Sequence, residues 1–161
     1  MTGIDADHCP TCGRELSSHD RHVLFRLPEP VLALPEHERA ARTWETEALM
    51  QVEGVGAFVR TLLPVRLTGG HQVTFGVWLG VRPEDLQRAF REWWAPTYSD
   101  LVLDGLVAND VPPWGLFGRG ARAVVRDANA LSYLDSSADP ELTRVLGEEW
   151  PHEAVLAALP A

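Results

Sequence analysis

Two alternating apolar segments joined by a glycine turn constrain the fold of this chain more than any other feature of its sequence. Within residues 57–67, and again within 72–80, apolar side chains recur at every second position. A period of two predicts β-strands, since successive side chains of a strand point to opposite faces. The intervening Gly69 and Gly70 suit the backbone of a tight turn. We therefore expect an antiparallel hairpin.

The two strands of this hairpin carry different local features. Pro64 removes an amide donor from the first strand, so we expect an edge position or a bulge there. In the second strand, the odd-numbered positions of 73–79 should face the core. Trp78 should face the other side, and the neighbouring Gly76 and Gly80 would let another group approach the backbone closely.

The clearest helix is predicted after Arg82. Pro83 suits the first helical position, and Pro96 should end the helix. Five apolar residues follow at the spacing of one helical face, namely Leu86, Ala89, Phe90, Trp93 and Trp94. Such a stripe predicts packing against a sheet, so core packing is our first explanation for these aromatic residues.

The remaining segments predict short strands and helices in one domain. We expect strands at 22–27, 99–108 and 121–127, and helices at 35–42, 141–149 and 151–159. The length of 161 residues fits a single domain. The sum is an α+β fold with a mainly antiparallel sheet packed against helices. We expect this domain at residues 23–161, after a small Cys/His-rich N-terminal head at residues 1–22.

Charge and composition disfavour several classes of function. The formal net charge is −9, which disfavours nucleic-acid binding. All 14 basic residues are arginine, so a Schiff-base lysine and a phosphate-loop lysine are excluded. No apolar run reaches the length of about 18 residues that a transmembrane helix needs, and the N-terminus has no secretory pattern. We expect a cytoplasmic protein that binds neither nucleic acid nor membrane.

The predicted head contains both cysteines of the chain. Cys9 and Cys12 are followed by His19 and His22, in the spacing C-x2-C-x6-H-x2-H. Thiolate and imidazole ligands at this cysteine spacing suit tetrahedral zinc, and four protein ligands would make the site structural. His8 could replace one histidine. Two alternatives stay open: a redox-active dithiol, or free cysteines with solvated histidines.

Arg60 is a candidate for ligand binding because it alternates with apolar neighbours on the first hairpin strand. A partly buried arginine needs an anionic partner. Within the fold, that partner could be Asp100 or Asp104. The other possibility is the carboxylate or phosphate of a ligand.

Several aromatic residues could line a ligand cleft together with Arg60. Trp78 lies between two glycines, and Trp114 lies in a Pro-Pro-Trp-Gly loop. Asn109, just before that loop, could add a polar contact. Aromatic walls with a few polar groups are typical of small-molecule pockets. We therefore name Arg60, Trp78, Trp114 and Asn109 as candidate ligand-binding residues.

Four strings of this sequence resemble a bacterial family catalogued as domain of unknown function 2199. They are Phe58-Val59-Arg60, Leu63-Pro64-Val65, Phe75-Gly76-Val77-Trp78 and Cys9-x-x-Cys12-Gly13. The resemblance covers roughly residues 8–115 and implies that family's fold and a bacterial, cytosolic source. Family members typically carry the cysteine pair, a following histidine and the strand arginine, which here are Cys9, Cys12, His19 or His22, and Arg60. The resemblance implies no activity.

The chain lacks the motifs of well-known catalytic sites, including G-x-S-x-G, H-E-x-x-H and the phosphate loop. We therefore expect a non-catalytic binding or adaptor domain for a protein or small ligand, at the face that carries Arg60. One alternative is a small metal-assisted hydrolase that uses His71 with a nearby carboxylate of Asp100, Asp104 or Asp110. Another is an acidic inhibitor or immunity-type protein whose charge attracts a basic partner.

Overall fold

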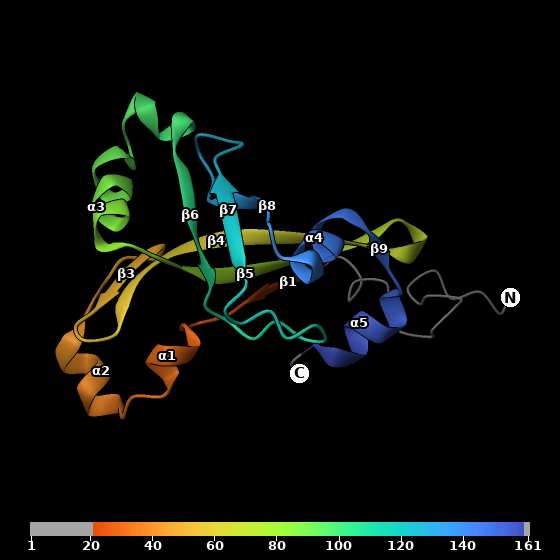
Figure 1. Ribbon diagram of the computed structural model, residues 1–161, viewed down its shortest axis with the longest axis horizontal. Helices are drawn as coiled ribbons and strands as arrows, with labels where there is room; N and C mark the ends of the chain where they lie inside the picture. The colour runs from red at the N-terminus through yellow and green to blue at the C-terminus, as the bar shows by residue number, and fades with distance from the viewer. Residues whose placement is uncertain (1–20, 160–161) are drawn as a thin grey trace, which may run out of the picture.

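The computed structural model describes residues 21–159, so Cys9, Cys12 and His19 of the predicted head lie outside the described residues. Figure 1 shows the arrangement of the elements. The strands are β1 (Arg21–Leu24), β2 (Thr43–Glu45), β3 (Leu49–Val52), β4 (Gly56–Leu67), β5 (His71–Val81), β6 (Val102–Val107), β7 (Gly120–Val124), β8 (Ser132–Ser136) and β9 (Glu149–Trp150). The helices are α1 (Glu29–Leu32), α2 (Glu36–Arg42), α3 (Pro83–Glu92), α4 (Pro140–Gly147) and α5 (His152–Ala158), with short 3-10 turns at Thr68–Gly70 and Pro96–Asp100.

The predicted hairpin is confirmed and forms the longest part of the sheet. β4 and β5 pair antiparallel without interruption, from Ala57 opposite Val81 to Leu67 opposite His71. Gly69 and Gly70 have φ angles of 80° and 78°. Side chains with a Cβ atom disfavour this left-handed region, so the two glycines allow the chain to reverse tightly here.

Five strands of the sheet close into a barrel. β5 pairs with β6, β6 with β7, and β7 with β8, all antiparallel. β8 then returns to β4 in parallel, with Thr61 opposite Ser132. Because β4 also pairs with β5, the circle is complete.

The closed barrel corrects the predicted open sheet packed against helices, although helices, a mainly antiparallel sheet and a single domain are all present. Alternation along a strand identifies its two faces, but it carries no information about a distant strand that pairs with its free edge. Closure here depends on β8, a strand that the sequence did not reveal.

Further strands extend the sheet beyond the barrel. β3 and then β2 continue antiparallel from the start of β4, while β1 lies parallel beside β5. β8 and β9 lie on the same edge of β4 as β3, the edge that faces away from β5, and they pair with the middle and the end of β4. Pro64 falls between these two pairings, where no amide donor is needed. The prediction of an edge-like position for Pro64 therefore holds at this stretch of β4.

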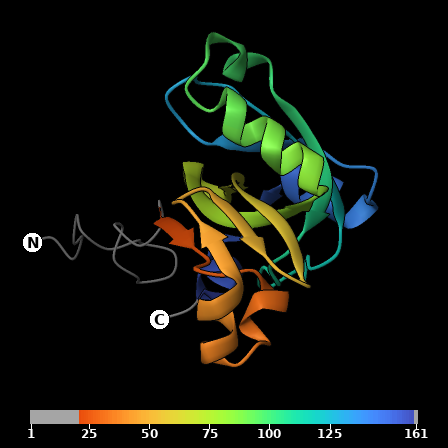
Figure 2. The ribbon, with the colours of Figure 1, turned by 90° about the vertical axis from the view of Figure 1, so that its left-hand side faces the viewer.

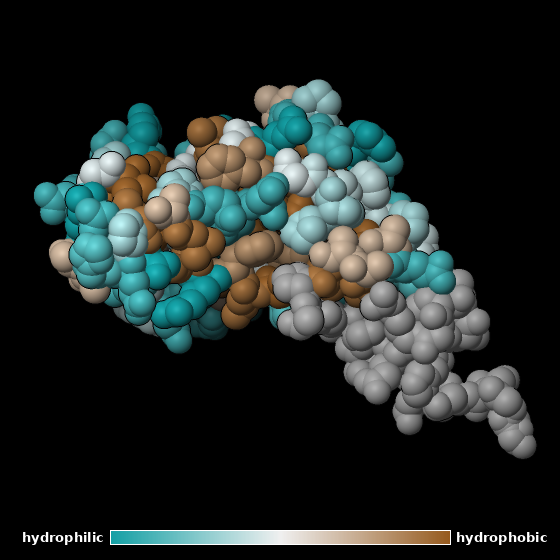
Figure 3. All heavy atoms as spheres, turned by 90° about the horizontal axis from the view of Figure 1, so that it is seen from below, coloured by the Kyte–Doolittle hydropathy of each residue, from teal (hydrophilic) through white to brown (hydrophobic). Residues whose placement is uncertain are grey.

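The two faces of β5 belong to two hydrophobic cores. Val73, Phe75, Val77 and Leu79 contribute to the barrel core, as the alternation predicted. On the opposite face, Trp78 joins a smaller core of Met50, Val52, Phe58, Ala108 and Val31, the last from α1. Residues of both faces are thus removed from water, because α1 covers the side that the barrel does not enclose. Figure 3 views that side and shows hydrophobic residues among polar ones on the surface.

Helix α3 lies where the sequence predicted it. Only some of the apolar residues expected to pack against the sheet do so. Leu86 and Ala89 are buried, and Trp93 packs against the barrel core. Phe90 and Trp94, however, are 56% and 88% exposed. Core packing was therefore the wrong explanation for Trp94. The helix ends at Glu92, so Trp94 lies beyond the regular spacing that suggested a continuous stripe.

The other predicted helices, α2, α4 and α5, lie close to the ranges expected from the sequence. Pro35 precedes α2, Pro151 precedes α5, and Asp139 caps α4 by accepting from the backbone amide of Leu142 at 2.9 Å. Figure 2 shows α3 on one side of the strands and α1 and α2 on the other. Within residues 21–159, none of the helices combines the length and apolar character needed to span a bilayer.

Candidate functional site

A groove of about 780 Å³ opens between the sheet and the end of α3. Its walls come from residues 46–49 before and within β3, from Phe90, Trp93 and Trp94 around the end of α3, and from residues 128–131 before β8. Leu24, Arg60 and Tyr98 complete the lining. These segments are far apart in sequence. The barrel, and the connection from β5 to β6 that contains α3, bring them together.

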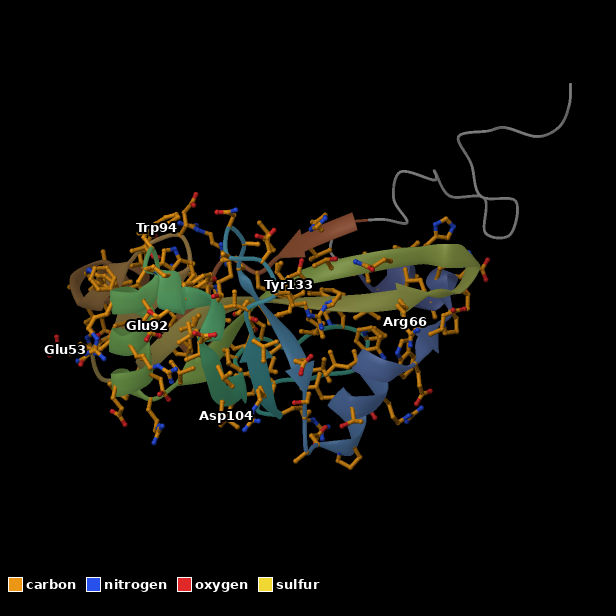
Figure 4. All side chains as sticks on the ribbon, turned by 90° about the horizontal axis from the view of Figure 1, so that it is seen from above. Glu53, Arg66, Glu92, Trp94, Asp104 and Tyr133 are labelled. Carbon is orange, nitrogen blue, oxygen red and sulfur yellow. The ribbon has the colours of Figure 1, made fainter. Side chains whose placement is uncertain are left out.

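One wall of the groove is aromatic and exposed. Phe90 contacts Trp44 edge to face at 5.5 Å between ring centroids, and Trp93 contacts Tyr98 at 5.0 Å. Trp94 projects from the end of α3 (Figure 4). The spacing of apolar residues gave no signal for this exposure, because it treated Trp94 as part of a helix that ends at Glu92.

Tyr98 fixes the wall opposite α3. Its hydroxyl donates a hydrogen bond to the backbone carbonyl of Ala130 at 2.7 Å. Burial raises the pKa of the Tyr98 phenol above its ordinary value, so the hydroxyl keeps its proton and remains a donor. The loop 128–131 is therefore tied to the turn that follows α3.

Arg60 supplies the positive charge of the groove. In β4 it lies opposite Trp78, and its guanidinium carbon is 4.5 Å from the centroid of the Trp78 ring. One terminal nitrogen donates to the carbonyl of Phe25 at 2.9 Å, and the other to that of Glu47 at 3.3 Å. Its Nε is buried and has no hydrogen-bond partner.

The surroundings of Arg60 shift its pKa, but its guanidinium group stays positively charged. Burial lowers its pKa, while the charges of Glu47 and Glu45 act in the opposite direction. Arginine nevertheless stays protonated, because its ordinary pKa is far above neutral.

Neither of the two internal partners considered for Arg60, Asp100 and Asp104, forms an ion pair with it. Asp104 instead binds Arg122 at 2.9 Å, an interaction that lowers the pKa of this carboxylate. The guanidinium group of Arg60 binds backbone carbonyls in place of a carboxylate. Among the described residues, its charge has no ion-pair partner.

Trp78 and Asn109 lie beneath the groove and not in its lining. Trp78 is buried, and its Nε1 lies within hydrogen-bond distance of the carbonyls of Phe25 and Arg26. Asn109 is fully buried, accepts from the amide of Trp78 at 2.7 Å and donates to the carbonyl of Leu27 at 2.9 Å. Both side chains thus hold the segment after β1 against β5.

Trp114, the fourth candidate, lies apart from this group. Its ring meets Phe75 of the barrel core at 6.2 Å and Trp150 of β9 at 5.2 Å, both edge to face. The structure therefore brings Arg60, Trp78 and Asn109 together around residues 25–29, and places Trp114 against the barrel core.

The hairpin end contains two neighbouring histidines. The rings of His71 and His152 are 5.7 Å apart and nearly perpendicular, at 77°. His152 is buried. Its amide donates to the Thr68 hydroxyl at 3.1 Å, and its Nδ1 lies 2.8 Å from that hydroxyl and 3.1 Å from the Thr68 carbonyl.

The other residues named for catalysis or metal binding are dispersed. Asp104 lies on β6, which pairs with β5 at Leu79 and Gly80, at the opposite end from His71. Figure 4 shows the same separation between Asp104 and Arg66, which marks the hairpin end. His22 is exposed in β1, opposite Thr74. Within the described part of the chain, no three His, Cys, Asp or Glu side chains are grouped as a metal site.

The ion pairs are also spread over several elements. They include Arg42 with Glu38 on α2, Arg88 with Glu92 on α3, Arg119 with Asp139 before α4, and Arg126 with Asp135 near β8. Many carboxylates are therefore next to arginines.

Comparison with known proteins provides the family and nothing more specific. A search of curated proteins and a search of solved structures each gave no match. The profile of one family, described as an uncharacterised protein conserved in bacteria (DUF2199), matches residues 8–122. This range includes the hairpin, α3, Arg60 and most of the barrel. Since the match covers well over half of the chain, the protein belongs to this bacterial family.

Proposed function

We propose that the protein is a non-catalytic binding domain whose ligand occupies the groove beside Arg60. The observation that carries this proposal is the combination of an exposed aromatic wall with an arginine that forms no ion pair with any residue from 21 to 159. Exposed aromatic side chains next to a partly buried charge are typical of surfaces that bind another molecule.

The chemistry of the groove favours a small ligand with an apolar body and one anionic group. Its volume lies within the usual range for small-molecule sites. The apolar body would contact Phe90, Trp93 and Trp94, while a carboxylate or similar anion would accept from Arg60. Polyanions fit less well, because Glu45 and Glu47 lie close enough to Arg60 to influence its pKa.

A pair of fluorescent probes tests both halves of this proposal. Anilinonaphthalene sulfonate carries an aromatic body and one negative charge, and phenylnaphthylamine is its uncharged counterpart. We expect the protein to bind the anionic probe more tightly. Trp94→Ala should weaken both probes, and Arg60→Gln should weaken the anionic probe by about tenfold, which corresponds to about 1.4 kcal/mol, while leaving the neutral one unchanged.

Arg126 provides a matched control. Like Arg60, it stacks on an aromatic ring, with its guanidinium carbon 4.7 Å from the Tyr133 ring centroid, but it does not line the groove. Arg126→Gln should therefore bind both probes as the parent protein does. Circular dichroism would check that each variant is folded. Unchanged binding in both Trp94→Ala and Arg60→Gln would refute the groove as the binding site.

A further inference from the structure

We propose that the ligand of the groove is a zwitterion, namely an amino acid with a large aromatic side chain. Its carboxylate would bind Arg60, and its ammonium group would bind Glu47, which also lines the groove. This inference rests on the proposed function, because it uses the same groove and the same arginine. It adds a second charged contact, from a glutamate that sequence analysis did not single out.

Glu47 lies in the turn between β2 and β3, and hydrogen bonds fix the backbone of this turn. The amide of Thr46 donates to the carbonyl of Leu49 at 2.8 Å. The Thr46 hydroxyl accepts from the amides of Ala48 and Leu49, at 3.3 and 3.1 Å. Hydroxyl contacts of this kind stabilise one turn conformation. The backbone of Glu47 therefore has a defined position on the wall of the groove.

Two further hydrogen bonds hold this turn beside Arg60. The Arg60 amide donates to the carbonyl of Ala48 at 2.7 Å, and a terminal guanidinium nitrogen donates to the carbonyl of Glu47 at 3.3 Å. The Glu47 carboxylate is thus within one side-chain length of the guanidinium group. Within residues 21–159, however, the two side chains form no ion pair with each other or with another residue.

This unpaired couple of opposite charges matches the two charges of an amino acid. The nitrogen and the carboxyl carbon of an α-amino acid are only about 2.5 Å apart. A carboxylate that accepts from Arg60 would therefore hold the ammonium group close to Glu47. Burial lowers the pKa of Arg60 and the negative charge of Glu47 opposes this shift, so the two groups are close enough to interact.

A ligand with a negative charge alone matches the groove less completely. Its anionic group would lie at Arg60 and would also be repelled by Glu47. The apolar part of the ligand has the exposed rings of Phe90 and Trp94 as its contact surface. The groove volume of about 780 Å³ has room for a side chain as large as indole. An aromatic amino acid therefore satisfies the charges and the apolar wall together.

Three indole compounds that differ only in charge test this inference. Tryptophan carries both charges, indole-3-propionate carries only the carboxylate, and tryptamine carries only the ammonium group. In isothermal titration of the full chain at neutral pH, we expect tryptophan to bind about fivefold more tightly than either of the others. Arg60→Gln should weaken tryptophan and indole-3-propionate, and it should not weaken tryptamine.

Glu47→Gln should act in opposite directions on two of these compounds. It should weaken tryptophan about fivefold, whereas indole-3-propionate should bind at least as tightly as before, because a repulsive charge is removed. Glu45→Gln is the matched control. Glu45 is also exposed and its charge also acts on the pKa of Arg60, but it does not line the groove. This control should leave tryptophan binding unchanged.

The inference and the proposed function fail in different ways. Tighter binding of indole-3-propionate than of tryptophan, or unchanged tryptophan binding in Glu47→Gln, would overturn the zwitterion. So would a parent chain that binds none of the three indoles. In each case, Arg60-dependent binding of the anionic fluorescent probe would still support the groove. Unchanged binding of every compound in both Arg60→Gln and Trp94→Ala would reject the groove itself, with circular dichroism as the check of folding.

Discussion

Around Arg60, side chains of the kinds that often bind ligands instead form hydrogen bonds to backbone carbonyl groups. Arg60, Trp78 and Asn109 have nitrogen donors directed at carbonyl groups of residues 25–27. Sequence analysis assigned all three to a ligand, because polar and aromatic side chains in apolar surroundings are typical of pockets. Only Arg60 also lines the groove. These partly buried carbonyls need donors as much as a ligand would.

Asn109→Ala should destabilise the protein through one unsatisfied backbone group. Asn109 is the acceptor for the buried amide of Trp78, and its loss leaves that donor without a partner. We expect the free energy of unfolding to fall by about 1–3 kcal/mol, measured by urea denaturation. Asn129→Ala removes an exposed amide side chain and should change it by less than about 0.5 kcal/mol. Equal stability of the two variants would contradict this role for Asn109.

At the scale of elements, local sequence signals predicted the positions of most helices and of the long hairpin. They did not predict which elements pack against one another. The turn glycines, Pro83 and the Asp139 cap act within a few residues, so the hairpin, α3 and α4 occur where the sequence indicated. The strands β2, β3, β8 and β9 were missed. All four are short, which leaves little alternation to recognise. β8 and β9, moreover, pair with β4, which is far from them in sequence.

Substituting Gly70 and Gly147 by alanine separates the effect of backbone conformation from that of steric contact, because both positions have space for a Cβ atom. An added Cβ atom would meet no other atom within 4 Å at either position, but only Gly70 has a positive φ, of 78°. Gly70→Ala should therefore destabilise the hairpin by about 1–2 kcal/mol. Gly147→Ala, at the end of α4, should be neutral or stabilise by up to about 1 kcal/mol. Thermal unfolding would measure both, and a shift of the same sign in the two variants would contradict the argument.

At the scale of the whole molecule, one buried contact joins the two strands that close the barrel. Thr61 of β4 donates to the carbonyl of Ser132 of β8 at 3.0 Å, and the Ser132 hydroxyl donates to the Thr61 hydroxyl at 3.0 Å. Both residues are buried. Since this is the parallel junction of the circle, its polar groups link segments 71 residues apart.

A double-mutant cycle can measure how strongly this junction couples the strands. Thr61→Val leaves buried groups of Ser132 without partners, so we expect a loss of about 1–3 kcal/mol. Ser132→Ala in the Thr61→Val background should cost less than it does alone, with a coupling energy of at least about 0.5 kcal/mol. Strictly additive losses in chemical denaturation would show that the two side chains act independently.

By itself, the sequence determined the elements whose causes are local. These are the antiparallel hairpin with its glycine turn, the positions of α2, α3, α4 and α5, and the inward face of β5. Their signals are steric and hydrogen-bonding preferences that act over a few residues, and they operate before any tertiary contact forms.

Tertiary structure decided which surfaces these elements present. It closed the sheet through β8, left Phe90 and Trp94 exposed on a groove, and buried Trp78 as a support for Arg60. It also placed His152 beside His71, although 81 positions separate them. Each of these outcomes depends on which segments meet in space, and residues that meet across such distances leave no periodic trace in a single sequence.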